Sequence, residues 1–164
     1  MNSLPDIHEV YAVRYAHHDR PKHENYIGGD PHDTNEPLAY FVWVIKGPHG
    51  TFVMDTGFDP AMAAKRGRTI VKPVAEGLRA IDVDAEQVTD VIISHLHYDH
   101  SGNHDLFPRA RYHLQDREMA YGTGRCMCHA HQRIPFEVDD VVAMVRRVFE
   151  GRVAFHDGEE TLVP

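Results

Sequence analysis

Two apolar runs, separated by a short Gly/Pro segment, constrain the fold most strongly. The first covers residues 38–45 and is rich in aromatic and β-branched side chains, and the second covers residues 51–54. Between them the chain reads Gly47-Pro48-His49-Gly50. Such runs favour strands and such a break favours a hairpin. The sequence therefore predicts an antiparallel pair of strands, which excludes an all-helical fold.

The rest of the chain alternates between strand and helix patterns. Further strands are predicted at residues 7–15, 88–93, 110–114 and 152–155, and helices at residues 74–81, 115–121 and 138–149. The last helix is the clearest, because apolar residues recur at helical spacing and Gly151 follows: Val138, Val141, Val142, Val145 and Phe149. Residues 17–37 are predicted to form a long polar loop. Interleaved elements over 164 residues predict one α/β (α+β) domain, residues 1–164.

Charge and composition exclude several classes of partner. Seventeen basic and twenty-five acidic residues give a net charge of −8, and Lys and Arg form no cluster, so nucleic acid is not expected to bind. The sequence shows neither a membrane-length apolar run nor a secretion leader, so no membrane association is expected. Its two cysteines, Cys126 and Cys128, are too few for a disulfide framework. Together these features predict a cytoplasmic protein.

The motif His95-x-His97-x-Asp99-His100 carries the chemistry. It directly follows the apolar strand predicted at residues 88–93, in a chain that holds 14 histidines. Residues i and i+2 of extended backbone point to one side, so His95 and His97 can converge on one ion. The loop after them can turn Asp99 and His100 toward a second ion. Imidazole and carboxylate ligands suit zinc, and also manganese or ferrous iron.

Two segments resemble the metallo-β-lactamase superfamily. Ser94 to Asn103, which reads Ser-His-Leu-His-Tyr-Asp-His-Ser-Gly-Asn, resembles its signature loop. Phe52 to Gly57, which reads Phe-Val-Met-Asp-Thr-Gly, resembles its preceding Asp motif. Within the superfamily the chain is most similar to N-acyl homoserine lactonase-like hydrolases, through Phe107-Pro108 and the ending from Asp157 to Pro164. The resemblance covers nearly the whole chain and implies an αββα sandwich, of which the N-terminal half to two-thirds is present.

The resemblance also implies roles for five residues. His95 and His97 would bind a first metal ion, Asp99 and His100 a second, with zinc as the usual metal. Asp99 would also act catalytically by carrying a proton. Asp55 would orient the imidazoles by hydrogen bonding without binding metal. In the implied reaction a hydroxide held between the ions attacks the carbonyl of a lactone, such as an N-acyl homoserine lactone, or of another ester.

The superfamily completes its site with a third histidine, a bridging aspartate and a last histidine, all beyond the position of Pro164. Histidines that could substitute within the chain are His113, His129, His131 and His156. The simplest interpretation is a domain truncated at its C-terminus. A half sandwich leaves one sheet face uncovered, with apolar side chains between Tyr40 and Ile45 exposed. The sequence therefore predicts a homo-oligomer or a missing C-terminal segment, and the activity of this chain alone is doubtful.

Several alternatives stay open at this level. Other enzymes of the same fold hydrolyse thioesters, as glyoxalase II does, or other esters and lactones, or use iron for redox chemistry. A third class is a non-catalytic fragment that acts by association. Asp55-Thr56-Gly57 also resembles the catalytic triplet of aspartic proteases, although that hypothesis leaves the histidine motif unexplained.

Two lesser groups of residues have competing interpretations. Residues 126–131, which read Cys-Met-Cys-His-Ala-His, could bind a metal ion, but their spacing favours a loop near the mouth of the site. The histidines of the polar segment are expected to be solvated: His17, His18, His23 and His32.

Overall fold

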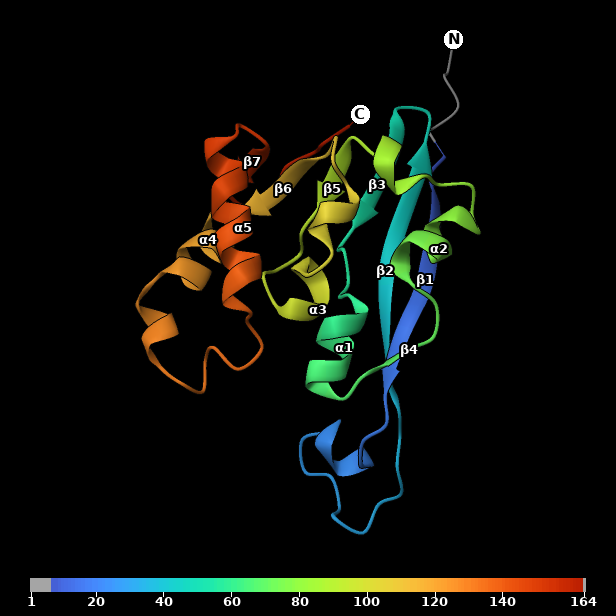
Figure 1. The fold of residues 1–164 in the computed structure, drawn as a ribbon, viewed down its shortest axis with the longest axis vertical. Helices are drawn as coiled ribbons and strands as arrows, with labels where there is room; N and C mark the ends of the chain where they lie inside the picture. The colour runs from blue at the N-terminus through green and yellow to red at the C-terminus, as the bar shows by residue number, and fades with distance from the viewer. Residues whose placement is uncertain (1–6, 164) are drawn as a thin grey trace.

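The computed structural model describes residues 7–163. Within this range all seven strands form one mixed sheet in the order β4-β1-β2-β3-β5-β6-β7 (Figure 1). The strands are β1 Glu9–His18, β2 Leu38–Gly47, β3 Gly50–Met54, β4 Thr69–Ile70, β5 Asp90–Ile92, β6 Arg111–Gln115 and β7 Val153–His156. The pairs β4–β1, β1–β2 and β2–β3 are antiparallel, and β3, β5, β6 and β7 run parallel.

The predicted hairpin is confirmed. Strands β2 and β3 pair from Trp43 with Met54 to Gly47 with Gly50, so Pro48 and His49 form the turn. The strands predicted at residues 7–15, 88–93, 110–114 and 152–155 are also present, with ends displaced by one to three residues. Parallel strands β5 and β6 place their carboxyl ends at the edge of the sheet where the histidine motif begins.

Within residues 7–163, five helices and four short 3₁₀ segments connect the strands. The helices are α1 Pro60–Arg66, α2 Val74–Arg79, α3 Tyr98–Ser101, α4 Asp116–Thr123 and α5 Val138–Phe149, and the 3₁₀ segments are η1 Lys22–Glu24, η2 Ala85–Gln87, η3 His104–Leu106 and η4 Arg125–Cys128. None of the described helices is long and apolar enough to cross a membrane. Helix α1 was not predicted, although Asp59 caps its start, Pro60 follows, and left-handed Gly67 ends it.

Helix α5 has the predicted bounds but a different buried face. Val141 and Met144 are buried, whereas Val138 is 70% and Phe149 90% exposed. Val142 is also 42% exposed, so helical spacing alone identified the helix but assigned three of its apolar residues to the wrong environment. Their exposure arises because the helix buries the face that holds Val141, Met144 and Arg147 and turns its other face outward.

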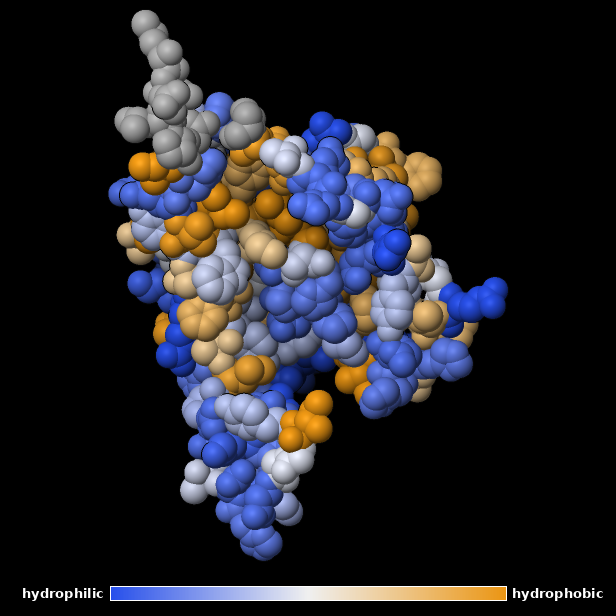
Figure 2. All heavy atoms as spheres, turned by 180° about the vertical axis from the view of Figure 1, so that it is seen from behind, coloured by the Kyte–Doolittle hydropathy of each residue, from blue (hydrophilic) through white to orange (hydrophobic). Residues whose placement is uncertain are grey.

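The helices cover one face of the sheet. The core is continuous from Val13, Val42 and Val91 of the sheet to Leu78 of α2 and Met144 of α5. Figure 2, which looks from behind, shows apolar side chains exposed on the upper part of the opposite side. The expectation of an uncovered face is thus confirmed within residues 7–163.

The exposure within β2 follows strand alternation. Tyr40, Val42 and Val44 are buried under the helices, whereas Phe41 and Trp43 are 36% and 42% exposed. The predicted exposure of apolar side chains between Tyr40 and Ile45 therefore concerns alternate residues, because successive side chains of a strand point to opposite faces.

Candidate metal centre

The four residues of the histidine motif lie on one loop, which we call the ligand loop and define as residues 94–103. It leaves the carboxyl end of β5 in extended conformation and then forms the short helix α3. The ring centroids of His95 and His97 lie 4.3 Å apart, and those of His95 and His100 lie 3.9 Å apart. Leu96 points the other way and is fully buried. The structure therefore brings the three imidazoles together, of which the i, i+2 argument predicted only the pair of His95 and His97.

Asp55 lies beneath this cluster, at the end of β3. Its Oδ1 accepts a hydrogen bond from the Ser94 amide at 2.8 Å, and its Oδ2 accepts one from the Ser94 hydroxyl at 2.9 Å. The same Oδ2 lies 2.8 Å from Nδ1 of His100. The carboxylate is 4% exposed and is committed to these contacts, which is the arrangement expected of a residue that orients ligands.

The backbone of Asp55 is strained. Its φ is +65°, in the left-handed region that non-glycine residues rarely adopt. Such conformations persist where the surrounding contacts require them, and they concentrate at functional sites. Here the left-handed turn lets the chain leave β3 while the carboxylate faces the ligand loop.

Residues after Asp55 hold the loop through its backbone. The amide of Thr56 donates to the carbonyl of His100 at 2.7 Å, and the amides of Gly102 and Asn103 donate to the carbonyl of Gly57 at 2.9 and 3.0 Å. A Cβ atom at Gly102 would lie 2.7 Å from the Tyr98 carbonyl oxygen. The φ of Gly102 is −79°, which any residue can adopt, so glycine is not needed here for its backbone conformation. It is needed because a side chain would collide with the Tyr98 carbonyl oxygen.

Burial and neighbouring charges give the imidazoles of the ligand loop different pKa values. Burial and the neighbouring His95 lower the pKa of His97 to about 4. Burial also lowers the pKa of His100, but its hydrogen bonds to Asp55 and Asp99 outweigh burial and raise that pKa to about 9. Burial is the largest single influence on the pKa of Asp99 and raises it, but the hydrogen bond and charge of His100, with the nearby His95, together outweigh burial and lower that pKa. At neutral pH the metal-free loop therefore holds a neutral His97 beside a protonated His100.

The donors fit a metal ion in kind and in grouping. Nδ1 of His95 lies 3.0 Å from the Ser94 hydroxyl, and Nδ1 of His100 contacts Asp55, so both rings keep Nε2 for an ion. Nε2 of His100 lies 3.3 Å from Asp99 Oδ2. Across residues 7–163, however, no group of three or more His, Cys, Asp or Glu side chains is arranged around one point. The donors of the loop are thus paired without converging as a complete ligand set.

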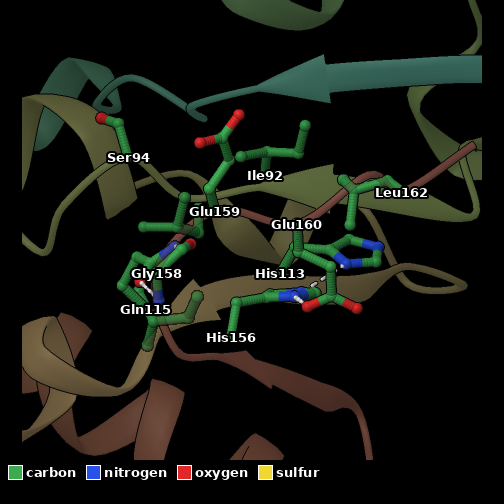
Figure 3. A pocket seen from close by; sticks show the side chains of 11 residues that line it. Ile92, Ser94, His113, Gln115, His156, Gly158, Glu159, Glu160 and Leu162 are labelled. Carbon is green, nitrogen blue, oxygen red and sulfur yellow. Dashed lines mark hydrogen bonds and ion pairs between the residues drawn. The ribbon is translucent and has the colours of Figure 1, made fainter.

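The histidines considered as substitutes lie in other surroundings. His113 Nδ1 and His156 Nε2 are 3.0 Å apart, His113 Nε2 lies 3.0 Å from Asp90 Oδ1, and His156 contacts Glu160. Figure 3 shows His113, His156 and Glu160 lining a cavity of about 310 Å³ that Ser94 borders on another side. His129 and His131 are exposed after η4.

The lesser groups of the sequence do not form metal sites in the described part of the chain. Cys126 and Cys128 are free thiols on η4. His32 is exposed and contacts Asp30, as a solvated histidine would. His17, His18 and His23 differ from the prediction, because their Nδ1 atoms are buried without a hydrogen-bond partner.

Sequence reasoning missed several residues that contact the ligand loop, and three of them lie close to its predicted ligands. The Tyr15 hydroxyl donates to the Asp99 carbonyl at 2.9 Å, and the Glu118 carboxylate accepts from the Leu96 amide at 2.8 Å. The Phe136 ring packs edge-on against His97, with centroids 4.8 Å apart. All three lie far from residues 94–103 in the sequence, and no local pattern indicates these contacts.

The mixed sheet, the histidine-rich ligand loop at the end of β5 and the buried aspartate after β3 together identify the class of protein to which this chain belongs. The model of the metallo-β-lactamase superfamily matches residues 35–161, and the chain belongs to that superfamily. This membership and the contacts of Asp55 exclude the aspartic-protease hypothesis. No curated protein sequence matches the chain with statistical significance.

Solved structures share the fold. An N-acyl homoserine lactone lactonase superposes with a TM-score of 0.69 at 15% identity, covering 96% of this chain and 59% of its own. A probable metal-dependent hydrolase from Staphylococcus aureus gives 0.71 at 10% identity, covering 96% and 61%. AidC, a dizinc quorum-quenching lactonase in complex with its product, gives 0.69 at 16% identity, covering 96% and 62%. The chain thus spans about 60% of the length of these structures.

Proposed function

We propose that this chain forms the metal-binding part of a metal-dependent hydrolase that opens a lactone ring, with N-acyl homoserine lactones as the substrate class. The observation that carries the proposal is the grouping of His95, His97 and His100 above the buried Asp55. Superfamily membership and the shared fold with lactonases support it.

The proposed cofactor is zinc, with manganese or iron as alternatives. His95 and His97 would hold one ion, and Asp99 and His100, whose Oδ2 and Nε2 lie 3.3 Å apart, a second. A bound ion of this kind polarises the substrate carbonyl and makes water nucleophilic at neutral pH. Because His100 is protonated in the metal-free chain, binding at its Nε2 requires loss of a proton.

The chain's own residues supply position and proton transfer. Asp99 is ionised at neutral pH and can accept a proton from the attacking water, then pass it to the oxygen that leaves as the ring opens. Asp55 keeps His100 oriented through Nδ1. Tyr15 anchors the backbone of Asp99 from β1. Each of these roles is local to the ligand loop and depends on its fixed conformation.

A substrate panel tests the proposal. The chain is loaded with zinc, manganese or iron and assayed against N-hexanoyl homoserine lactone, a thioester and a p-nitrophenyl ester. We expect preferential lactone opening, and a loss of about 100-fold or more in Asp99→Asn, since general acid–base groups contribute about 10²–10⁴-fold. Asp116→Asn, on the exposed start of α4, is the matched control. Preference for the thioester favours the glyoxalase II-like alternative, and no turnover with any metal favours a non-catalytic fragment.

For a protein partner, we propose a second copy of this chain on the uncovered face of the sheet. Its exposed aromatic residues Phe41 and Trp43 form an apolar surface of the kind that marks interfaces. In analytical ultracentrifugation, Phe41→Thr/Trp43→Thr is expected to weaken self-association about tenfold, as loss of interface anchors does. Phe149→Ser, on the helical side, should have no such effect. A monomeric wild-type chain would contradict self-association and favour a segment beyond Pro164 as the covering element.

A further inference from the structure

The backbone between the two first predicted ligands has its own anchor. Leu96 lies between His95 and His97, and its amide donates to Oε1 of Glu118 at 2.8 Å. Strand β5 ends at Ile92, so this amide lies beyond the ladder of the sheet. Without Glu118 a partly buried donor would lose its acceptor, which is costlier than the hydrogen bond is stabilising.

Helix α4 also holds the side chain of the same residue. Leu96 is fully buried, and a Cβ atom built on Gly122 would lie 3.1 Å from its Cδ1. Glu118 and Gly122 are four residues apart and therefore share one face of α4. The start of α4 is fixed in turn, since the helix follows β6 without a linker. Both the amide and the side chain of Leu96 thus rest on one helix face.

The direction of the two imidazoles depends on this residue. His95 and His97 project from the opposite side of the extended backbone to Leu96. A rotation of the backbone at Leu96 would therefore also change the direction in which these two imidazoles point. The ring centroids of His95 and His97 lie 4.3 Å apart in the structure in which the Leu96 amide is held by Glu118 of α4.

We infer that Glu118 is a positioning residue for the His95–His97 pair, acting through the backbone of Leu96. This role rests on the proposed function, because it matters for metal binding at that pair. Glu118 touches neither imidazole in this role, so its contribution is to the order of the ligands. Glu118 is only partly buried, and one of its carboxylate oxygens accepts the hydrogen bond from the Leu96 amide.

Cobalt titration of the purified chain tests the inference, with the visible absorption of bound Co²⁺ as the readout. We expect Glu118→Ala to bind Co²⁺ about tenfold more weakly, as loss of groups that orient ligands does. Glu118→Gln keeps an acceptor oxygen and should stay within about threefold of wild type. Asp116→Ala removes a carboxylate from the same turn without contacting the loop and is the matched control. Hydrogen exchange at the Leu96 amide should accelerate in Glu118→Ala but not in Glu118→Gln.

The outcomes separate this inference from the proposed function. Equal Co²⁺ affinity and spectra in wild type, Glu118→Ala and Glu118→Gln would overturn the positioning role and leave the hydrolase proposal standing. Equal weakening in Glu118→Ala and Asp116→Ala would overturn it too, as a general effect on α4. A wild-type chain that binds Co²⁺ but opens no lactone would contradict the proposed function and leave the positioning role standing. Wild type that binds no Co²⁺ would overturn both.

Discussion

His97→Ala is expected to lower the metal affinity of the chain by about 100-fold or more, and the purified variant should therefore contain less metal than the wild type. Loss of a direct ligand should exceed the 10–100-fold effect of losing a group that merely orients one. His97 is well suited to be that ligand, because burial keeps its imidazole neutral and its ring lies 4.3 Å from that of His95. Elemental analysis after dialysis, together with competition against a chelator, measures the effect.

His131→Ala is the matched control for this measurement, since it removes an exposed histidine outside the ligand loop. It should retain the metal content of the wild type. Equal loss in both variants would place the metal at residues 126–131 instead. No metal in any sample would mean that the histidine motif does not bind metal in this chain, and the enzyme proposal would be dropped.

The metal-free chain is expected to lose about 2 kcal/mol of unfolding free energy as the pH rises from 6.5 to 9. His100 has a folded-state pKa of about 9 against an ordinary value of 6.5, because Asp55 and Asp99 stabilise its protonated form. Its contribution is therefore complete below pH 6.5 and is lost as the pH rises through 9. One pKa unit corresponds to about 1.4 kcal/mol, and the partial exposure of the ring reduces the total.

Asp55→Asn should remove most of this pH dependence. Asparagine tolerates the left-handed backbone that Asp55 adopts, so the change removes the charge and spares the turn. Asp82→Asn is the matched control, because Asp82 is the other described non-glycine residue with positive φ, at +58°. Urea unfolding with chelator at pH 6 and pH 9.5 measures the difference. Identical pH dependence in the two variants would show that the pair of His100 and Asp55 does not couple protonation to folding.

Elements with strong local patterns were predicted well from the sequence. The hairpin of β2 and β3 follows from its two apolar runs and the Gly/Pro turn between them. The bounds of α5 follow from its helical spacing and from Gly151, which comes after it. The grouping of His95 with His97 follows from the period of extended backbone. By contrast, α1 has too few turns for an apolar period, and its signal lay in the caps Asp59 and Gly67.

What the sequence by itself determined was the resemblance to the superfamily, the interleaved strands and helices with their hairpin, and the loop that carries the chemistry, because each depends on residues adjacent or regularly spaced in the chain. Only the tertiary structure decided how that loop is held. Tyr15 and Glu118 reach it from β1 and α4, and their contacts exist only once those elements are packed, whereas the orienting role of Asp55 was already expected from the resemblance. The one-sided covering of the sheet was likewise decided by packing, since alternation along β2 predicts two faces but not which partner covers each.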